Sequence, residues 1–287
     1  MSIGNGRAVV ITGSSTGIGA ACALHLDRIG FLVFAGVRKI ADGEALQRQG
    51  ENRLIPLILD VTDAASIQRS QRIVSEHVGA HGLFGLVNNA GIAVAGPLEA
   101  VPISDLRRQL EINLIGQVAV IQAFLPLIRM ARGRIVNMGS IAGRAAMPLM
   151  GPYSASKFAL EAITDALRLE VQQWGIEVSI VEPGAIATPI WDKSGKGATD
   201  LEVATTPELR TLYAGVIAGV KKVVGEAAKR AIAPDAVAQA VERALTAARP
   251  KTRYLVGPDA KLRALMIKLL PDRASDAVLT WVLKLPR

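Results

Sequence analysis

Short continuous apolar runs alternate with amphipathic segments along the first two thirds of the chain. A short apolar run bounded by polar residues is typical of a strand that is buried on both faces, which predicts strands at 8–12, 31–36, 54–59, 83–87, 134–137 and 178–181. The segments between them have helical periodicity, which predicts helices at 17–29, 66–78, 104–130 and 152–174. Pro152 suits the first turn of the last helix, and Gly175 suits its end.

This alternation of strands and helices predicts an α/β fold of the Rossmann type. Such a fold is a doubly wound parallel sheet with right-handed crossovers and helices on both faces. Beyond residue 184 the pattern weakens: we predict a mobile substrate lid at 185–233, a helix at 235–248, a strand at 253–256 and a C-terminal extension at 257–287. No repeat or linker divides the chain, so we predict a single domain over residues 1–287, which that length permits.

The composition is that of a globular protein, with 50% hydrophobic and 20% charged residues. The single cysteine, Cys22, excludes an internal disulfide and a cysteine zinc site, and its apolar neighbours indicate a core position. The three histidines follow no ligand spacing, so we expect no metal. The apolar run at 8–11 is too short for a signal peptide, and the run at 114–128 is too short to span a membrane. We therefore expect a cytoplasmic protein.

The formal net charge of +8 raises three possible partners: nucleic acid, an anionic membrane surface, or an anionic cofactor or substrate. The basic residues are scattered and no nucleic-acid motif accompanies them, so we expect no nucleic-acid partner. The segment 261–287 combines leucines and basic residues at helical spacing. It could lie on a membrane or cover a pocket, but packing on its own domain or on a neighbouring subunit is the interpretation we favour.

A glycine-rich turn, TGSSTGIG at 12–19, joins the first predicted strand to a helix. Glycines there permit a tight turn and close approach of a pyrophosphate, and the helix N-terminus offers free N–H groups to its charge. The spacing differs from the most general dinucleotide motif, and close packing would also explain glycines here. We predict that a dinucleotide contacts Gly13, Ser15, Thr16, Gly17, Ile18 and Gly19.

The ends of the next strands offer further cofactor contacts. Arg38 follows the second strand, where an NAD site usually has an acid, and an arginine there accommodates the 2′-phosphate of NADP. This favours NADP(H) over NAD(H), although Arg38 could be a solvated loop charge. Asp60, followed by Val61, could bind the adenine amino group or cap a turn. After the fourth strand, the cofactor can lie against the backbone of Asn89, Ala90 and Gly91.

Ser140, Tyr153 and Lys157 form the sharpest candidate cluster. Tyr153 and Lys157 are four residues apart on a predicted helix, so they share a face. A phenol with a pKa of about 10 is a poor acid/base at neutral pH, and a neighbouring ammonium lowers that pKa. Ser140, at the end of the preceding strand, could donate a hydrogen bond to a substrate oxygen. The cluster predicts proton transfer to and from an oxygen atom.

Together these elements resemble the short-chain dehydrogenase/reductase family, in its standard-length branch. The resemblance covers residues 7–190 and rests on 12–19, Asp60, 88–91, Asn113, Ser140, 153–157, Pro183, Gly184 and Thr188, in the family's order. Within the family, the segments 33–38, 59–63, 133–137, 153–158 and 181–184 are similar to the retinol and 17β-hydroxysteroid dehydrogenase group.

The resemblance implies a role for each matching residue. Tyr153 would exchange a proton with the substrate oxygen, Lys157 would hold the nicotinamide ribose and lower the pKa of Tyr153, and Ser140 would orient the substrate. Asn113 would organise a water that links Lys157 to solvent. Three further residues would border the nicotinamide: Pro183, Gly184 and Thr188.

The resemblance also implies an NADP(H)-dependent oxidoreductase for a hydrophobic carbonyl or alcohol. The predicted helices 104–130 and 152–174 resemble the family's subunit-contact helices, so we expect a homodimer or homotetramer. A 3-oxoacyl-thioester reductase is the nearest alternative, because its chemistry is the same. A non-catalytic cofactor sensor would not need Asn113, Ser140, Tyr153 and Lys157 together, and the glycine spacing disfavours a sugar-nucleotide epimerase or dehydratase.

Overall fold

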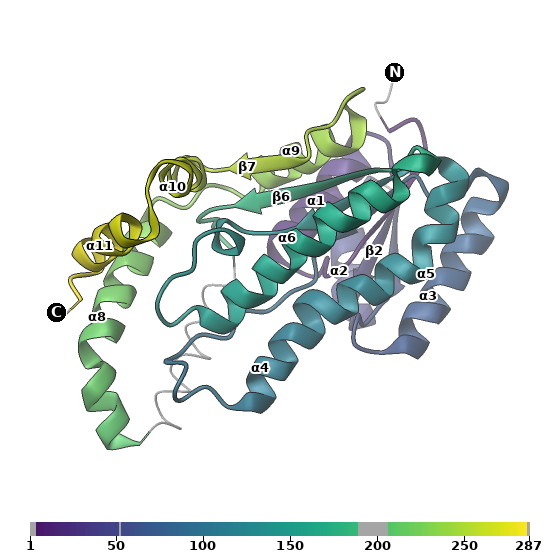
Figure 1. Ribbon diagram of the computed structural model, residues 1–287. Coiled ribbons are helices and arrows are strands. Elements are labelled where there is room, and N and C mark those ends of the chain that lie inside the picture. Colours follow the sequence, from purple (N-terminus) through teal and green to yellow (C-terminus); the bar gives the residue numbers. More distant parts are fainter. Residues whose placement is uncertain (1–3, 52, 189–205, 286–287) are drawn as a thin grey trace.

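The computed structural model describes residues 4–51, 53–188 and 206–285 (Figure 1). Within them, seven strands form one parallel sheet in the order β3-β2-β1-β4-β5-β6-β7. The strands are β1 Ala8–Ile11, β2 Leu32–Val37, β3 Leu54–Ile58, β4 Gly85–Asn88, β5 Arg134–Met138, β6 Glu177–Pro183 and β7 Arg253–Val256. Most of their side chains are buried, which is why these strands read as continuous apolar runs.

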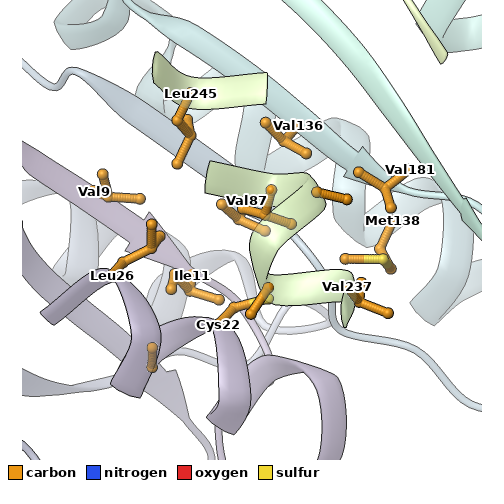
Figure 2. Packing of buried hydrophobic residues seen from close by; sticks show 14 of the residues in the cluster. Val9, Ile11, Cys22, Leu26, Val87, Val136, Met138, Val181, Val237 and Leu245 are labelled. Atoms are coloured by element: carbon orange, nitrogen blue, oxygen red, sulfur yellow. The ribbon is translucent and has the colours of Figure 1, made fainter. Parts of the chain in front are cut away.

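Helices cover both faces of the sheet. One face packs against α1 Gly17–Arg28, α2 Ile40–Gln47 and α9 Asp235–Thr246, and the other against α3 Ala64–Val78, α5 Gly116–Ala131 and α6 Gly151–Val171. Figure 2 shows the first of these layers, where Ile11 of β1 lies among Cys22 of α1 and Val237 of α9. Cys22 is fully buried, as its apolar neighbours predict. The doubly wound α/β fold predicted from the sequence is confirmed.

The strand order places a switch point beside β1. Strand β2 lies on one side of β1 and β4 on the other, so the connections that follow β1 and β4 leave in opposite directions. In open parallel sheets, ligands bind at such a point, beyond the carboxyl ends of the strands. The glycine-rich turn and the loop after β4 both begin there.

The predicted helix 104–130 is confirmed in its extent but not in its regularity. It consists of α4 Ile103–Leu110, a π-helical turn Glu111–Ile115 and α5. A π turn inside an α-helix often marks a functional position, and this one contains Asn113. The span Ile103–Ala131 is long and apolar enough to cross a membrane by length and composition. Its apolar side chains at Val120, Phe124 and Ile128 pack on the sheet.

Two helices were missed in the sequence. Helix α2 is short and has Gly43 at its centre, which packs against Pro56 of β3. Helix α8 Pro207–Lys229 lies within the segment predicted as a lid, of which residues 189–205 fall outside the described part. The sequence does contain the usual signals for its start, a threonine at the N-cap and a proline at the first helical position. In the structure the Thr206 Oγ1 accepts from the Leu209 N–H at 3.4 Å.

The C-terminal extension forms α10 Pro258–Leu269 and α11 Asp272–Leu283. Both lie with α8 at one end of the molecule, beyond the carboxyl ends of β6 and β7 (Figure 1). Ala260 and Ala264 of α10 pack on Ile141, and Gly219 of α8 packs closely on Leu283 of α11. The extension therefore packs on its own domain, which is the interpretation favoured from the sequence.

Candidate active site

A cavity of about 870 Å³ opens at the carboxyl edge of the sheet. All the site residues predicted from the sequence line it, and the fold thus brings together positions from the ends of six strands, β1 to β6. They are Gly13, Ser15, Thr16, Gly17, Ile18, Gly19, Arg38, Asp60, Val61, Asn89, Ala90, Gly91, Asn113, Ser140, Tyr153, Lys157, Pro183, Gly184 and Thr188.

The turn after β1 has a shape that only glycine permits at two positions. Gly13 has a φ of +66°, and a Cβ there would lie 2.8 Å from the Cα of Ala90. A Cβ on Gly19 would overlap the carbonyl oxygen of Gly13. The turn opens onto the N-terminus of α1, whose N–H groups and dipole favour an anion. This cradle fits the pyrophosphate of a dinucleotide.

The loop after β4 is tied to this turn by Thr12, which the sequence placed in the glycine-rich motif without a role of its own. The Thr12 Oγ1 accepts hydrogen bonds from the backbone N–H groups of Asn89 and Ala90, both at 2.9 Å. In return, the Asn89 Nδ2 donates to the carbonyl oxygens of Thr12 and Gly13 at 3.0 Å. The Asn89 amide therefore shapes the cofactor cradle from within. Its side chain holds the two loops together.

Arg38 and Asp60 border the cavity at the same end as the glycine-rich turn, because β2 and β3 lie beside β1. Arg38 is exposed directly after β2, where its guanidinium can reach a group bound beside the turn. The Asp60 Oδ1 accepts from the N–H of Thr62 at 2.9 Å and from its Oγ1 at 2.8 Å. Asp60 thus caps the turn after β3, which was one of its two predicted roles, while it also borders the cavity.

Asn113 is fully buried on the π turn and clamps the loop that follows β4. Its Oδ1 accepts from the Ile92 N–H and its Nδ2 donates to the Ile92 carbonyl, both at 2.9 Å. The same Nδ2 donates to the Ser156 Oγ at 3.2 Å. Gln109, which the sequence analysis did not single out, adds a 3.0 Å bond to the Ile92 carbonyl. Both amides therefore fix the backbone beside helix α6, which carries Tyr153 and Lys157.

Ser140 and Tyr153 face each other in the cavity. Ser140 follows β5 and its Oγ accepts from the Ala142 N–H at 3.1 Å, which fixes the loop that carries it. Burial raises the pKa of Tyr153, and a hydrogen bond with Ser140 acts in the opposite direction. The resemblance implied that Lys157 would lower this pKa. In the structure burial is the larger influence on this pKa, and the Lys157 Nζ lies 5.8 Å from the centre of the phenol ring.

Lys157 is buried one helical turn after Tyr153. Its Nζ donates to the Met138 carbonyl oxygen at 2.7 Å, which holds the ammonium at the end of β5. Burial lowers the pKa of Lys157 to about 8, and the Glu161 carboxylate acts against this lowering. The amine is therefore poised to change its charge near neutral pH.

A network of charged side chains, of which Glu161 and Glu182 are buried, continues behind Lys157. The Arg253 guanidinium of β7 bonds to Glu161 at 3.1 Å and to Asp165 at 2.6 Å, both on α6. Glu182 of β6 is fully buried and lies 3.4 Å from both Arg253 and Arg144. Burial, with Glu182 nearby, raises the pKa of Glu161 to about 7. Sequence reasoning missed this network, because its members come from separate elements.

The end of the cavity away from the glycine turn is lined by α8, α10 and α11. These helices contribute apolar side chains to the wall: Val223, Val224, Leu262, Met266, Ile267, Val278, Leu279 and Val282. The described residues contain no cluster of three or more His, Cys, Asp or Glu side chains that could hold a metal ion. This end suits an apolar substrate, close to Ser140 and Tyr153.

Fold and site define a Rossmann-type oxidoreductase that uses a nicotinamide dinucleotide. The model of the family described as short chain dehydrogenase matches residues 7–199. The chain belongs to this short-chain dehydrogenase family and acts on a CH–OH group with NAD(P). The predicted family is therefore confirmed.

Known relatives match nearly the whole chain. Retinol dehydrogenase 5 of Mus musculus is 41% identical over 97% of this chain and 89% of its own length. The NADPH-dependent 3-dehydrocapnine reductase of Ornithobacterium rhinotracheale is 37% identical over 95% of both proteins. The crystal structure of a short chain dehydrogenase from Burkholderia cenocepacia J2315 in complex with NADP superposes with a TM-score of 0.73, at 27% identity and over the full length of both chains. The likeness to the retinol dehydrogenase group is also confirmed.

Proposed function

We propose that this protein is an NADP(H)-dependent oxidoreductase that interconverts a hydrophobic ketone or aldehyde and the corresponding alcohol. One observation carries the proposal: a single cavity joins the glycine cradle and Arg38 at one end, Ser140 and Tyr153 between, and an apolar wall at the other end. The cofactor would occupy the first part and the substrate the last. The reacting carbon would then lie beside the Tyr153 hydroxyl.

The residues of the site suit this chemistry. Bound nicotinamide supplies or accepts the hydride. During reduction the Tyr153 hydroxyl donates its proton to the substrate oxygen, and during oxidation the phenolate accepts it. The raised pKa of Tyr153 keeps the phenol protonated at neutral pH, ready for the reductive direction. Ser140, which hydrogen-bonds with Tyr153, orients the same oxygen.

Lys157 acts on the cofactor side of Tyr153. Its ammonium is held by the Met138 carbonyl and would bind the nicotinamide ribose hydroxyls with its remaining donors. A cation at this place stabilises the phenolate that forms during turnover. Asn113 fixes the loop at Ile92, and a water held beside it would link Lys157 to solvent.

The preference for NADP(H) rests on Arg38. A guanidinium at the end of β2 is suited to bind the 2′-phosphate through charge-assisted hydrogen bonds, whereas it offers no acceptor to a ribose hydroxyl. The names of two similar proteins, the NADPH-dependent 3-dehydrocapnine reductase and the dehydrogenase in complex with NADP, support the same cofactor. The names of the retinol dehydrogenases support a retinoid- or steroid-like substrate.

We also propose a cytoplasmic homodimer or homotetramer. Exposed apolar side chains on α5, α6 and the π turn support an assembly through these helices, among them Ile115, Phe158 and Leu169. A large apolar patch on a surface helix often marks a subunit interface. Light scattering on the purified protein tests the assembly, and a monomer would contradict it.

Cofactor absorbance tests the proposed function. The purified protein is supplied with NADPH or NADH and with a panel of carbonyls: steroid ketones, retinal, small diketones and a 3-oxoacyl thioester. We expect NADPH-dependent reduction of an apolar ketone or aldehyde. Turnover confined to the thioester would favour the alternative 3-oxoacyl-thioester reductase. Cofactor binding without turnover of any carbonyl or alcohol would contradict the proposal.

A further inference from the structure

The apolar wall at the substrate end of the cavity includes one arginine and three aspartates, Arg263 with Asp259 on α10 and Asp272 with Asp276 on α11. Arg263 lies on α10 between Leu262 and Met266, which also border the cavity, and it is partly buried. Burial lowers the pKa of its guanidinium, and Asp259 acts against this lowering. A desolvated cation in an apolar wall is costly unless a counterion accompanies it.

The described part of the chain provides no hydrogen bond or ion pair to the Arg263 guanidinium. The two other arginines close to this part of the fold are satisfied: Arg144 bonds to Glu182, and Arg253 bonds to Glu161. Asp259, one helical turn before Arg263, already accepts from the Ala185 N–H at 2.8 Å. Asp272 and Asp276 of α11 border the cavity as well, and neither forms an ion pair with Arg263.

Helix α10 places Arg263 on the wall of the cavity that also holds Ser140 and Tyr153. Its residues Ala260 and Ala264 pack on Ile141, which directly follows Ser140. Through Asp259, the same helix holds the backbone that follows Gly184. Arg263 lies in the turn between these contacts, and it borders the same cavity as Tyr153. Arg38, at the glycine-turn end of the cavity, would already bind the 2′-phosphate of NADP(H), so Arg263 is not needed for that group.

We propose that Arg263 binds an anionic group of the substrate, so that the substrate is an anionic amphiphile: a hydrocarbon ketone or alcohol that carries a carboxylate, sulfonate or phosphate. This inference rests on the proposed function and narrows its substrate class. The planar guanidinium presents paired donors that match the oxygens of such a group. The apolar side chains from α8, α10 and α11 then enclose the hydrocarbon part.

Matched neutral and anionic substrates test the inference. Long-chain oxo-carboxylic acids with the ketone at several positions are compared with their methyl esters, with NADPH oxidation as the readout. We expect the acid that best fits the cavity to exceed its ester in kcat/KM by about tenfold or more, which is the scale of a charge-assisted hydrogen bond. R263Q should abolish this preference and leave the Kd for NADPH unchanged.

A control variant separates a specific contact from general attraction. K268Q removes one positive charge from an exposed position of α10 that does not border the cavity, and it should keep the acid preference. Equal activity on acid and ester in the unaltered protein, or a preference that survives in R263Q, would overturn the inference while the proposed function stands. A raised Kd for NADPH in R263Q would assign Arg263 to the cofactor instead.

A binding measurement keeps the inference testable without turnover. Calorimetry follows the same acids and esters as they bind to the protein saturated with NADP⁺. A Kd for an acid that rises about tenfold or more in R263Q, and not in K268Q, would support the subsite even if no carbonyl were reduced. Absence of turnover alone would then count against the proposed function, and equal binding by both variants would count against the subsite.

Discussion

The amide of Asn113 offers a quantitative test of how the site is held. Asn113→Ala removes the acceptor of the Ile92 N–H and one of two side-chain donors to the Ile92 carbonyl. The orphaned N–H is partly buried and costs about 1–3 kcal/mol. The Ile92 carbonyl still accepts a hydrogen bond from the Gln109 Nε2 at 3.0 Å. Loss of the Asn113 Nδ2 donor therefore costs only about 1 kcal/mol more. We expect a total loss of roughly 2–4 kcal/mol in the free energy of unfolding.

Urea unfolding of a double-mutant cycle measures this value and its cause. Asn113→Ala and Gln109→Ala are made singly and together. Because each amide can serve the Ile92 carbonyl when the other is missing, the double variant should lose about 1 kcal/mol more than the sum of the single losses. Strict additivity would show that the two amides do not substitute for each other at the Ile92 carbonyl. A single Asn113→Ala loss below about 0.5 kcal/mol would show that the clamp at Ile92 does not stabilise the fold.

Three further changes test separate parts of the account. Arg38→Asp should lower kcat/KM for NADPH about 10- to 100-fold and leave that for NADH nearly unchanged; a parallel loss with both cofactors would contradict 2′-phosphate binding. Glu161→Gln removes the carboxylate that raises the pKa of Lys157, and this pKa should then fall below about 8. The alkaline decline of kcat should move to lower pH as a result. An unchanged pH profile of kcat would show that Glu161 does not influence the pKa of Lys157. Gly19→Ala places a Cβ on the Gly13 carbonyl and should raise the Kd for NADPH at least about tenfold by fluorescence titration; unchanged binding would mean that the turn does not hold the pyrophosphate.

The local signals in the sequence were enough for the sheet and for the cofactor end of the site. Buried strands are continuous apolar runs, and their carboxyl ends must meet at one edge, so the positions of Gly13, Asp60 and Ser140 followed from the order of strands. The four-residue spacing of Tyr153 and Lys157 placed both on one helical face.

The remainder depends on contacts between distant segments. Gln109 and Thr12 gain their roles only because α4 and β1 lie beside the loop after β4. Glu182 reads as one polar residue in a strand, and only the packing of β6 between β5 and β7 buries it beside Arg253. The periodicity of α10 predicted an amphipathic helix, but not that Arg263 would border the cavity. The π turn at Asn113 has no periodicity of its own by which to find it.

The rate of NADPH-dependent carbonyl reduction in Tyr153→Phe, with Tyr213→Phe as the matched control, tests whether Tyr153 is the acid/base. Tyr213 lies on α8 and its hydroxyl donates to the exposed Glu99 at 2.9 Å, outside the cavity. If Tyr153 is the proton donor, Tyr153→Phe lowers kcat about 10²- to 10⁴-fold and still binds NADPH, while Tyr213→Phe behaves as the unaltered protein. If Tyr153→Phe kept more than about a tenth of the activity, the proposed acid/base role of Tyr153 would be wrong.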